Sequence, residues 1–485
     1  MRIILILHRY LGVVVGLMMA LWCLSGFVMM YQDYPSLAGA DRLKGLEPLR
    51  LAPAAARPPL ELDDDSQLSG FRVEMMADRP TLQVTQGRRR RAFDLNTGQS
   101  IDEVDAPTAL RIAAVYARGN GIMGQPTDRG VIERNQWTMG VQGAGPVYRF
   151  TYGDPAGTEL YVAQGSGLAV QTTTRATRFW SWIGAVPHWL YPTVLRSNGK
   201  LWTQVVVYAS LIGVFLTVTG IYVGIVRFRK YKSGRWSPYR GWFYWHHIIG
   251  LVFGVLTLTW VTSGMFTMNP WGFLDTSAGQ VERRQLAGEV TGAQVKTFLA
   301  AAPQLTDGSL QQIDGAPLGG ALYAMAVKAD GSSVRIDAKG APAPLKEPEL
   351  IAAMAKMGDA PVIGFSRMAR EDAYYYSNYD RKAVLPVYRA DLGDKGHSTV
   401  YIDAKTGRMA FAVDDVGRQS RWLMTGLHDL DFAWLRARPL WDIVVILLLA
   451  GVTGGCITGF WLAIKRIGRD VSELSAAAKR KTAKS

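Results

Sequence analysis

The sequence predicts a membrane protein: an α-helical bundle of four spans, built from two parallel repeats, with α+β modules outside the bilayer. Four apolar stretches predict the spans, because roughly 20 helical residues cross the about 30 Å of hydrocarbon in a bilayer. They lie at 11–31, 202–226, 248–268 and 440–464. Two related halves of the chain, about 240 residues apart, predict the repeats.

The composition fits a chain that lies partly inside a bilayer. Hydrophobic residues make up 48% of the sequence, too many for an ordinary soluble enzyme and too few for a chain wholly inside the membrane. Two long polar segments, rich in Gly, Pro, Thr and Asp, are each large enough to be a domain. The predicted order is helix 1 (1–31), outer domain 1 with an aromatic segment (32–200), helix 2 (201–228), a basic loop (229–245), helix 3 (246–269), outer domain 2 (270–438), helix 4 (439–465) and a tail (466–485).

The repeat has two well-matched parts. LHRYLGVVVGLMMALWCLSGFVMM (7–30) aligns without a gap with WHHIIGLVFGVLTLTWVTSGMFTM (245–268), which places His8 on His246, Gly12 on Gly250, Gly16 on Gly254, Trp22 on Trp260 and Ser25-Gly26 on Ser263-Gly264. Residues 161–196 align with 401–436, which places Trp182 on Trp422, His188 on His428 and Leu195-Arg196 on Leu435-Arg436. Four of the six histidines therefore form two matched pairs.

Basic residues beside the spans predict the orientation, since short loops rich in Lys and Arg stay in the cytoplasm. The loop after the second span reads RFRKYKSGRWSPYR. The chain after the fourth span carries Lys465, Arg466, Arg469, Lys479, Arg480 and Lys481. Both termini and this loop are therefore expected in the cytoplasm, and the two polar segments on the outer side.

The net charge of +14 is partly explained by these anchors and is not interpreted as nucleic-acid binding. One basic run, Arg88 to Arg91, lies on the outer side. We interpret it as the solvated face of a strand or hairpin; a docking site for an anionic ligand is the alternative.

The N-terminal apolar run is interpreted as a span, with a cleavable signal peptide ending near Ala38-Gly39-Ala40 as the alternative. The run is longer than a usual signal core, and its repeat partner at 248–268 is internal. Cys23 and Cys456 both lie in spans, so they indicate neither a structural disulfide nor a zinc site.

The polar segments contain two copies of a strand–turn–strand pattern, RRAFDLNTGQSID (90–102) and STVYIDAKTGRMAFAVD (398–414). In each, the Gly of Thr-Gly supplies positive φ at the turn. VRIDAKGAPAP (334–344) is a looser copy, and TALRIAAVYA and PELIAAMAKM have helical spacing. This pattern resembles the PepSY module. With the LHRYLG-type first span, nearly the whole chain resembles the PepSY-associated transmembrane family, which includes bacterial inner-membrane ferric-siderophore reductases that bind haem.

The matched histidines are predicted to bind a cofactor. In a parallel repeat, His8 and His246 lie at the cytoplasmic ends of spans 1 and 3, and His188 and His428 lie on the outer side. A ligand on the two-fold axis meets equivalent residues from both sides, and imidazole suits iron. The resemblance implies haem, so each pair is expected to supply both axial nitrogens of one haem b, two in all. No CxxCH motif exists for covalent attachment.

The histidines also have simpler interpretations. A histidine at a membrane interface can be an amphipathic anchor without a ligand. His247 aligns with Arg9, and both are expected beside the haem, His247 near its propionates; a one-residue slip would exchange His247 with His246. His397 has no partner and is expected on the surface.

Other residues near the predicted haems have two interpretations each. The glycines at GxxxG spacing indicate close helix packing or room for a macrocycle. Trp22 and Trp260 are interpreted as interfacial belt residues, with electron transfer as the alternative. A group of arginines is expected beside the outer haem, where they would bind propionates or an acidic chelate, or simply anchor the interface: Arg178, Arg196, Arg421, Arg436 and Arg438.

No nicotinamide or flavin fingerprint is found, since GNGIMG (119–124) follows a helical stretch instead of a strand. The electron donor is therefore expected to be a separate protein, a diffusible carrier or a membrane quinol. The expected function is a di-haem carrier that passes electrons across the bilayer to ferric iron, in a siderophore, with no catalytic residue beyond the haem ligands. The alternative is a haem-free regulator whose modules bind or inhibit a protease or sensor.

Overall fold

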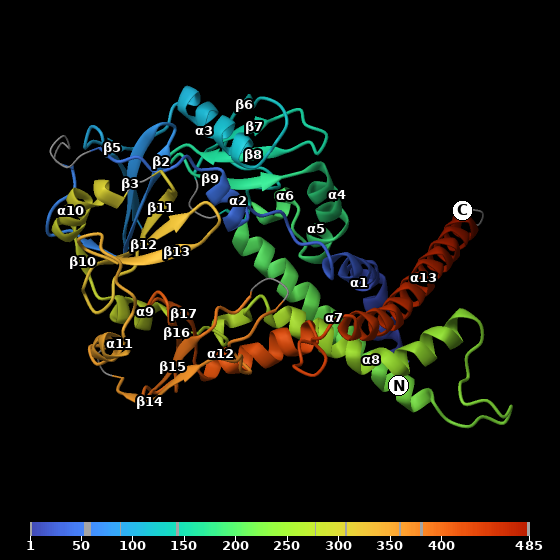
Figure 1. The fold of residues 1–485 in the computed structure, drawn as a ribbon. Helices are drawn as coiled ribbons and strands as arrows, with labels where there is room; N and C mark the ends of the chain where they lie inside the picture. Colours follow the sequence, from blue (N-terminus) through green and yellow to red (C-terminus); the bar gives the residue numbers. More distant parts are fainter. Residues whose placement is uncertain are drawn as a thin grey trace. The chain divides into compact units, whose positions relative to one another are not determined.

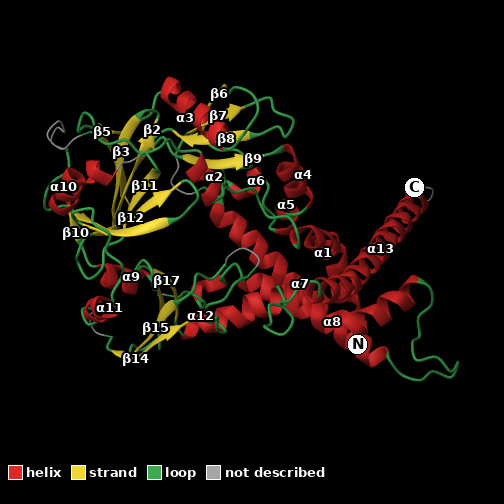
Figure 2. Cartoon of the chain, in the orientation of Figure 1, coloured by secondary structure: helices red, strands yellow, loops and turns green. Residues whose placement is uncertain are grey.

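The computed structural model describes residues 2–52, 60–87, 89–141, 145–276, 278–305, 308–357, 360–378 and 382–482. The chain divides into two compact units. Unit 1 comprises Met1–Tyr34, Phe179–Asp275 and Gln419–Ser485, and unit 2 comprises Pro35–Arg178 and Thr276–Arg418. Unit 1 is built from helices, and the strands belong to unit 2 (Figure 1, Figure 2).

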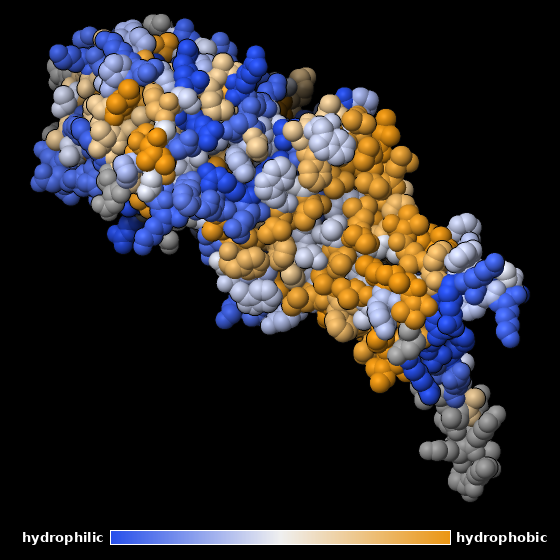
Figure 3. All heavy atoms as spheres, turned by 90° about the horizontal axis from the view of Figure 1, so that it is seen from below, coloured by the Kyte–Doolittle hydropathy of each residue, from blue (hydrophilic) through white to orange (hydrophobic). Residues whose placement is uncertain are grey.

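Four long helices form unit 1: α1 (Arg2–Met29), α7 (Gly199–Arg227), α8 (Trp242–Phe266) and α13 (Leu440–Thr482). All four are long and apolar enough to cross a membrane, which confirms the four predicted spans. α1 packs against α7 and α13, and α8 packs against the same two helices. The helices therefore form a ring in which α1 and α8 are diagonal partners. Hydrophobic side chains cover a broad band of their outer surface (Figure 3), as expected where lipid replaces water.

Two of the long helices extend beyond the predicted apolar stretches. α1 begins at Arg2 instead of residue 11, so His8 and Arg9 lie within the helix. α13 continues into the predicted tail, where Arg466 and Asp470 form an ion pair at 2.6 Å. Such i,i+4 pairs stabilise a helix after its apolar stretch has ended. The side chains of 479–481 lie outside the described residues.

Short helices lead into the bundle. They are α4 (Arg175–Ile183), α5 (Ala185–His188) and α6 (Thr193–Arg196) before α7, α12 (Asp415–Ser420) and the π-helical η4 (Arg421–Gly426) before α13, and η2 (Pro270–Gly272) after α8. The side chain of Asn198 accepts a hydrogen bond from the Leu201 amide and caps α7. α5 packs on α1 and η4 packs on α8, which brings a histidine to each of those two helices.

Unit 2 contains a seven-stranded sheet with the order β13-β12-β11-β2-β3-β4-β5. Its strands are β2 (Gly70–Met76), β3 (Arg79–Gln86), β4 (Arg89–Asp94), β5 (Ser100–Ile101), β11 (Leu310–Gly315), β12 (Tyr323–Lys328) and β13 (Ser333–Asp337). β2 and β11 pair antiparallel, with Val73 opposite Ile313. The two polar segments therefore share one sheet, whereas the sequence predicted two separate outer domains. Each segment covers a strand edge of the other, and an uncovered edge would expose backbone donors and acceptors.

Each polar segment also forms a four-stranded sheet, with the orders β6-β7-β8-β9 and β14-β15-β16-β17. The strands are β6 (Thr127–Ile132), β7 (Val147–Thr151), β8 (Glu159–Ala163), β9 (Ala169–Thr173), β14 (Val362–Met368), β15 (Val387–Leu392), β16 (Thr399–Asp403) and β17 (Met409–Val413). The two predicted Thr-Gly turns are present, with φ of +78° at Gly98 and +73° at Gly407, a conformation that favours glycine. The looser copy forms β13 and a bridge from Ile336 to Pro342.

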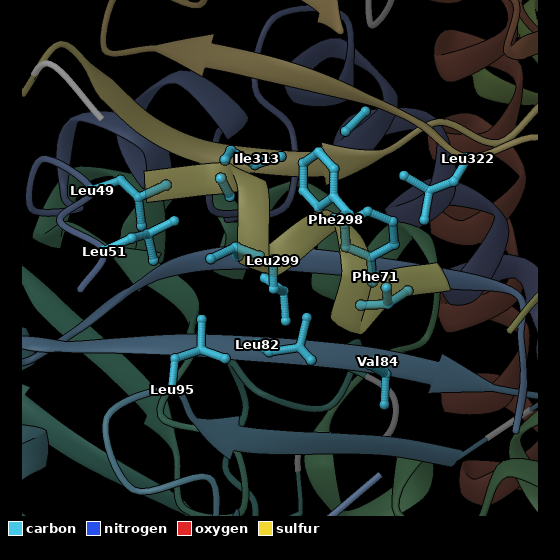
Figure 4. Close-up of a cluster of buried hydrophobic side chains, with 14 of the residues drawn as sticks. Leu49, Leu51, Phe71, Leu82, Val84, Leu95, Phe298, Leu299, Ile313 and Leu322 are labelled. Atoms are coloured by element: carbon cyan, nitrogen blue, oxygen red, sulfur yellow. The ribbon is translucent and has the colours of Figure 1, made fainter. Parts of the chain in front are cut away.

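The two stretches of predicted helical spacing form α3 (Ala106–Gly119) and α11 (Glu347–Met354). The remaining elements of unit 2 are α2 (Gly39–Lys44), β1 (Gln67–Leu68), α9 (Gln280–Ala287), β10 (Val290–Thr291), α10 (Gly292–Ala301) and η3 (Ala302–Leu305). α10 covers the seven-stranded sheet, and the ring of Phe298 lies 5.6 Å from that of Phe71. Leu82 and Ile313 are fully buried beside them, in a core to which both polar segments contribute (Figure 4).

Candidate functional site

The first histidine pair, His8 and His246, lies inside the bundle of unit 1. His8 comes from α1 and His246 from α8, and the centroids of their rings are 6.2 Å apart. Because α1 and α8 are diagonal partners, the rings approach each other across the bundle interior. The structure thus brings together two residues that the repeat alignment had paired.

The second histidine pair, His188 and His428, lies at the other ends of the same two helices. His188 ends α5 and His428 follows η4, and their ring centroids are 6.1 Å apart. His188 contacts Ser25 of α1. From His8 to Ser25, α1 rises by about 25 Å at about 1.5 Å per residue, so the two pairs are separated by most of the length of the bundle.

All four histidines are held by the same kind of contact. The Nδ1 atom of each ring lies within hydrogen-bond distance of a helix carbonyl oxygen and of the Ser or Thr hydroxyl three residues later in that helix. These carbonyl and hydroxyl groups are Leu216 and Thr219 for His8 (3.0 and 3.4 Å), Gly455 and Thr458 for His246 (both 3.2 Å), Trp22 and Ser25 for His188 (3.2 and 3.1 Å), and Trp260 and Ser263 for His428 (both 3.2 Å).

These contacts determine which ring nitrogen carries the proton. A carbonyl oxygen only accepts hydrogen bonds, so Nδ1 is the donor and Nε2 keeps its lone pair. Burial, with a smaller contribution from His428, lowers the pKa of His188 to about 4, so this ring is neutral at pH 7. Metal-binding histidines have this arrangement, in which the second nitrogen donates to a carbonyl group and orients the ring.

A glycine follows each of the four hydroxyl residues, and at Gly220, Gly459 and Gly264 it leaves space for the ring. A Cβ atom on Gly220 would lie 2.7 Å from His8 Cε1, and one on Gly459 would lie 2.9 Å from His246 Cε1. The same distances are 4.0 Å from Gly26 to His188 and 3.2 Å from Gly264 to His428. The repeat alignment pairs only the two Ser-Gly dipeptides; Thr219-Gly220 and Thr458-Gly459 are a second matching pair in the sequence.

The separation of the rings fits a metal ion bound between them. An imidazole nitrogen binds a first-row transition metal at about 2 Å, so two rings on opposite sides of one ion have centroids about 6 Å apart. Within the described ranges, no group of three or more His, Cys, Asp or Glu side chains is placed to hold a metal. Two facing imidazoles fit an iron whose other ligands come from a haem macrocycle, and they do not fit a four-ligand zinc site.

His247 belongs to neither pair. Its Nε2 lies 2.9 Å from the Gly224 carbonyl oxygen and its Nδ1 lies 2.8 Å from Ser237 Oγ. Both nitrogens are therefore engaged within the protein, and His246 is the residue that faces His8. His397 lies on the surface of unit 2, as expected, and its Nδ1 lies within hydrogen-bond distance of Asp415 Oδ2, at 2.7 Å.

Five of the six predicted arginines lie in unit 1, and four of them contact aromatic or acidic side chains there. Arg196 lies over the rings of Tyr191 and Trp202, at 5.2 and 4.7 Å from their centroids. Arg421 and Arg436 both pair with Asp431, and Arg438 pairs with Asp442. Asp431 stands where the first repeat has Tyr191, so ion pairs in the second half replace cation–π contacts in the first.

The other two predicted arginines, Arg178 and Arg9, have different surroundings. Arg178 belongs to unit 2, where its guanidinium donates to Thr173 Oγ1 and the Gly157 carbonyl oxygen and pairs with Glu159 at 3.5 Å. Those donors hold a sheet together. Arg9 is exposed on α1.

Several buried donors in unit 1 have no hydrogen-bond partner among the described residues: Arg196 Nε, Arg227 Nε, Trp22 Nε1 and Trp260 Nε1. Arg196 precedes α7 and Arg227 ends it, so one such guanidinium stands at each end of that helix. Haem propionates are anionic and prefer arginine. Arg227, which sequence analysis counted only as part of the basic loop, is therefore a candidate partner for a propionate.

The glycines at GxxxG spacing have two different environments. A Cβ atom would lie 3.7 Å from the Phe460 backbone at Gly16 and 2.9 Å from Ile221 at Gly254, so these two serve close helix packing. A Cβ at Gly250, one turn after His246, would meet nothing within 4 Å, and one at Gly12 would meet only a Leu216 methyl at 4.0 Å. Open space thus lies one turn after each histidine of the first pair.

The comparison with known protein families covers almost the whole chain. The model of the PepSY-associated TM region matches residues 5–466 of the 485. This range contains both histidine pairs and all of unit 2. A comparison with curated proteins gives no match. With four helices able to span a membrane, the chain is a multi-pass membrane protein that belongs to the PepSY-associated TM family.

Proposed function

We propose that this protein is a two-haem electron carrier, built from two parallel repeats, that reduces ferric iron in a chelate such as a siderophore. One observation carries the proposal: two pairs of facing imidazoles, 6.2 and 6.1 Å apart, whose Nδ1 atoms are engaged and whose Nε2 atoms are left for a ligand. This is the donor set of a haem with two axial histidines.

His8 and His246 would hold one haem, and His188 and His428 the other. When bound, each haem supplies a one-electron Fe(II)/Fe(III) couple. Because both histidines of a pair would bind the iron, no position would be left for O₂, which favours electron transfer. The carbonyl and hydroxyl groups at each Nδ1 hold the ring in place and raise its basicity. Arg196 and Arg227 are suited to bind propionates.

The proposed orientation places both termini and the basic loop in the cytoplasm of a bacterium, and unit 2 outside the inner membrane. Its support is the concentration of Lys and Arg in the loop after α7 and in the end of α13. The first histidine pair would then receive electrons from a cytoplasmic or quinol donor, and the second pair would deliver them outside. Reduction to Fe(II) weakens binding by hard oxygen ligands and releases the iron.

The test is the spectrum and the haem content of the purified full-length protein. We expect two low-spin haems b per chain, measured as the pyridine haemochrome. His8→Ala or His246→Ala should remove one haem, and His188→Ala or His428→Ala should remove the other. In oriented vesicles, a membrane-impermeant ferric siderophore on the outer side should reoxidise the reduced protein. A colourless protein after haem-replete expression would refute the proposal and favour the haem-free regulator.

A further inference from the structure

A cavity within unit 2 lies where the two polar segments meet. Its volume is about 440 Å³, within the range of about 300–1,000 Å³ that is typical of small-molecule pockets. The first half of the chain contributes β2, β3, β4 and the turn between β8 and β9. The second half contributes α9, β11 and the turn between β16 and β17. Neither half forms this cavity alone.

The lining of the cavity is strongly basic. Four arginines line it: Arg72, Arg90, Arg283 and Arg408. The only acidic residue in the lining is Asp314, which already pairs with Arg72 at 2.6 Å. Across the part of unit 2 that the structure describes, no carboxylate forms an ion pair with the other three arginines. The four arginines therefore outnumber the single carboxylate of the lining, and the cavity carries an excess of positive charge.

The rest of the lining is partly polar, with the side chains of Ser69, Gln83 and Thr85, and partly apolar. Leu168, Leu286, Pro317 and Met409 form the apolar part, whereas the side chains of Phe71 and Val84 belong to the core on the other face of the sheet. The guanidinium of Arg408 donates a hydrogen bond to the Gly315 carbonyl oxygen. This bond anchors it to β11 at the edge of the cavity. Guanidinium groups bind carboxylates through two parallel hydrogen bonds. An apolar wall beside them favours the carbon skeleton of an organic molecule over an inorganic anion.

We propose that this cavity binds an organic polycarboxylate, either free or as the ligand of a metal ion. Arg90 then takes part in the docking site that was the alternative interpretation of the basic run. Arg89 and Arg91 lie on the opposite face of β4, because successive side chains of a strand alternate, and neither lines the cavity; Arg88 lies outside the described residues. If the proposed electron transfer holds, the metal-bound form is its substrate, but binding requires no haem.

The test is equilibrium binding of citrate and of gallium(III) citrate to the full-length protein in detergent. Gallium(III) replaces ferric iron without being reduced. We expect saturable binding that weakens with added salt. Arg90→Gln and Arg283→Gln should each weaken it about tenfold or more, the effect of losing one charge-assisted hydrogen bond. Tighter binding of gallium citrate than citrate would identify a metal chelate as the ligand, and the reverse would identify a free polycarboxylate.

Two neighbouring arginines serve as matched controls. Arg89→Gln and Arg284→Gln remove the same charge from the same elements, β4 and α9, but neither residue lines the cavity. Both should bind as the unmodified protein does. The proposal fails if neither citrate form binds, if the control substitutions weaken binding equally, or if a cationic gallium trihydroxamate binds as well. A His8→Ala, His188→Ala protein should bind citrate normally, which separates this proposal from that of the haems.

Discussion

The space for the His8 ring depends on the absence of a methyl group from α7. A Cβ atom on Gly220 would lie 2.7 Å from His8 Cε1, whereas non-bonded carbons prefer a separation of about 3.5–4.0 Å. In Gly220→Ala, the ring must therefore move by about 1 Å. The helix itself should tolerate the change, since alanine has a helix propensity about 1 kcal/mol more favourable than glycine.

The size of this shift decides the expected outcome. A displacement of about 1 Å is several times the about 0.2 Å tolerance of a metal–ligand distance. The shift also acts on the 3.0 Å hydrogen bond from His8 Nδ1 to the Leu216 carbonyl oxygen. Loss of such a supporting contact typically weakens metal binding by about 10–100-fold. We expect Gly220→Ala to retain the haem of the second pair and to lose most of the haem of the first.

Haem content and a redox titration measure this effect. Gly459→Ala should reproduce it, because its Cβ would lie 2.9 Å from His246 Cε1. The matched control is Gly454→Ala, which adds the same methyl group to a spanning helix where the nearest atom, an Ile249 methyl carbon, lies at an ordinary contact distance of 3.7 Å. Normal haem content and potentials in Gly220→Ala would refute the proposed role of His8. Equal loss in Gly454→Ala would show that any added methyl disturbs the bundle.

Three further substitutions test the surroundings of the site. His247→Phe should leave both haems in place and lower stability by about 1–3 kcal/mol, because two buried hydrogen bonds are lost; loss of a haem would instead make His247 a ligand. Arg178→Gln should leave the visible spectrum unchanged and lower the urea midpoint of unit 2, and a spectral shift would contradict its assignment to the sheet. Burial alone would raise the pKa of Glu159, but hydrogen bonds from Arg149 and Tyr161 hold it below its usual value. The resulting stabilisation of the folded state is present above the unfolded-state pKa of about 4.3 and is lost as the pH falls through the lower folded-state pKa. Glu159→Gln should therefore reduce the loss of unfolding free energy of unit 2 at acid pH, measured by urea unfolding.

The sequence by itself determined the membrane-spanning helices, the Thr-Gly turns and the pairing of the histidines. Each of these follows from a signal carried by neighbouring residues or by direct comparison of the two halves. A run of about 20 apolar residues identifies a span wherever it packs, and a Thr-Gly turn needs positive φ at the glycine whatever surrounds it. The gapless alignment placed His8 on His246 before any helix contact was known.

Only the tertiary structure decided how each histidine is held and which neighbours are excluded. The groups that contact Nδ1 come from other helices, 208 residues away for His8 and 163 for His188, and no local pattern reports such a distance. His247 is chemically identical to His246, yet both of its nitrogens are engaged because it faces Ser237 and Gly224. The arginine cavity likewise exists because β2 pairs with β11 across the two halves of the chain. Periodicity indicates which face of an element is buried, whereas the partner at that face is set by packing between distant segments.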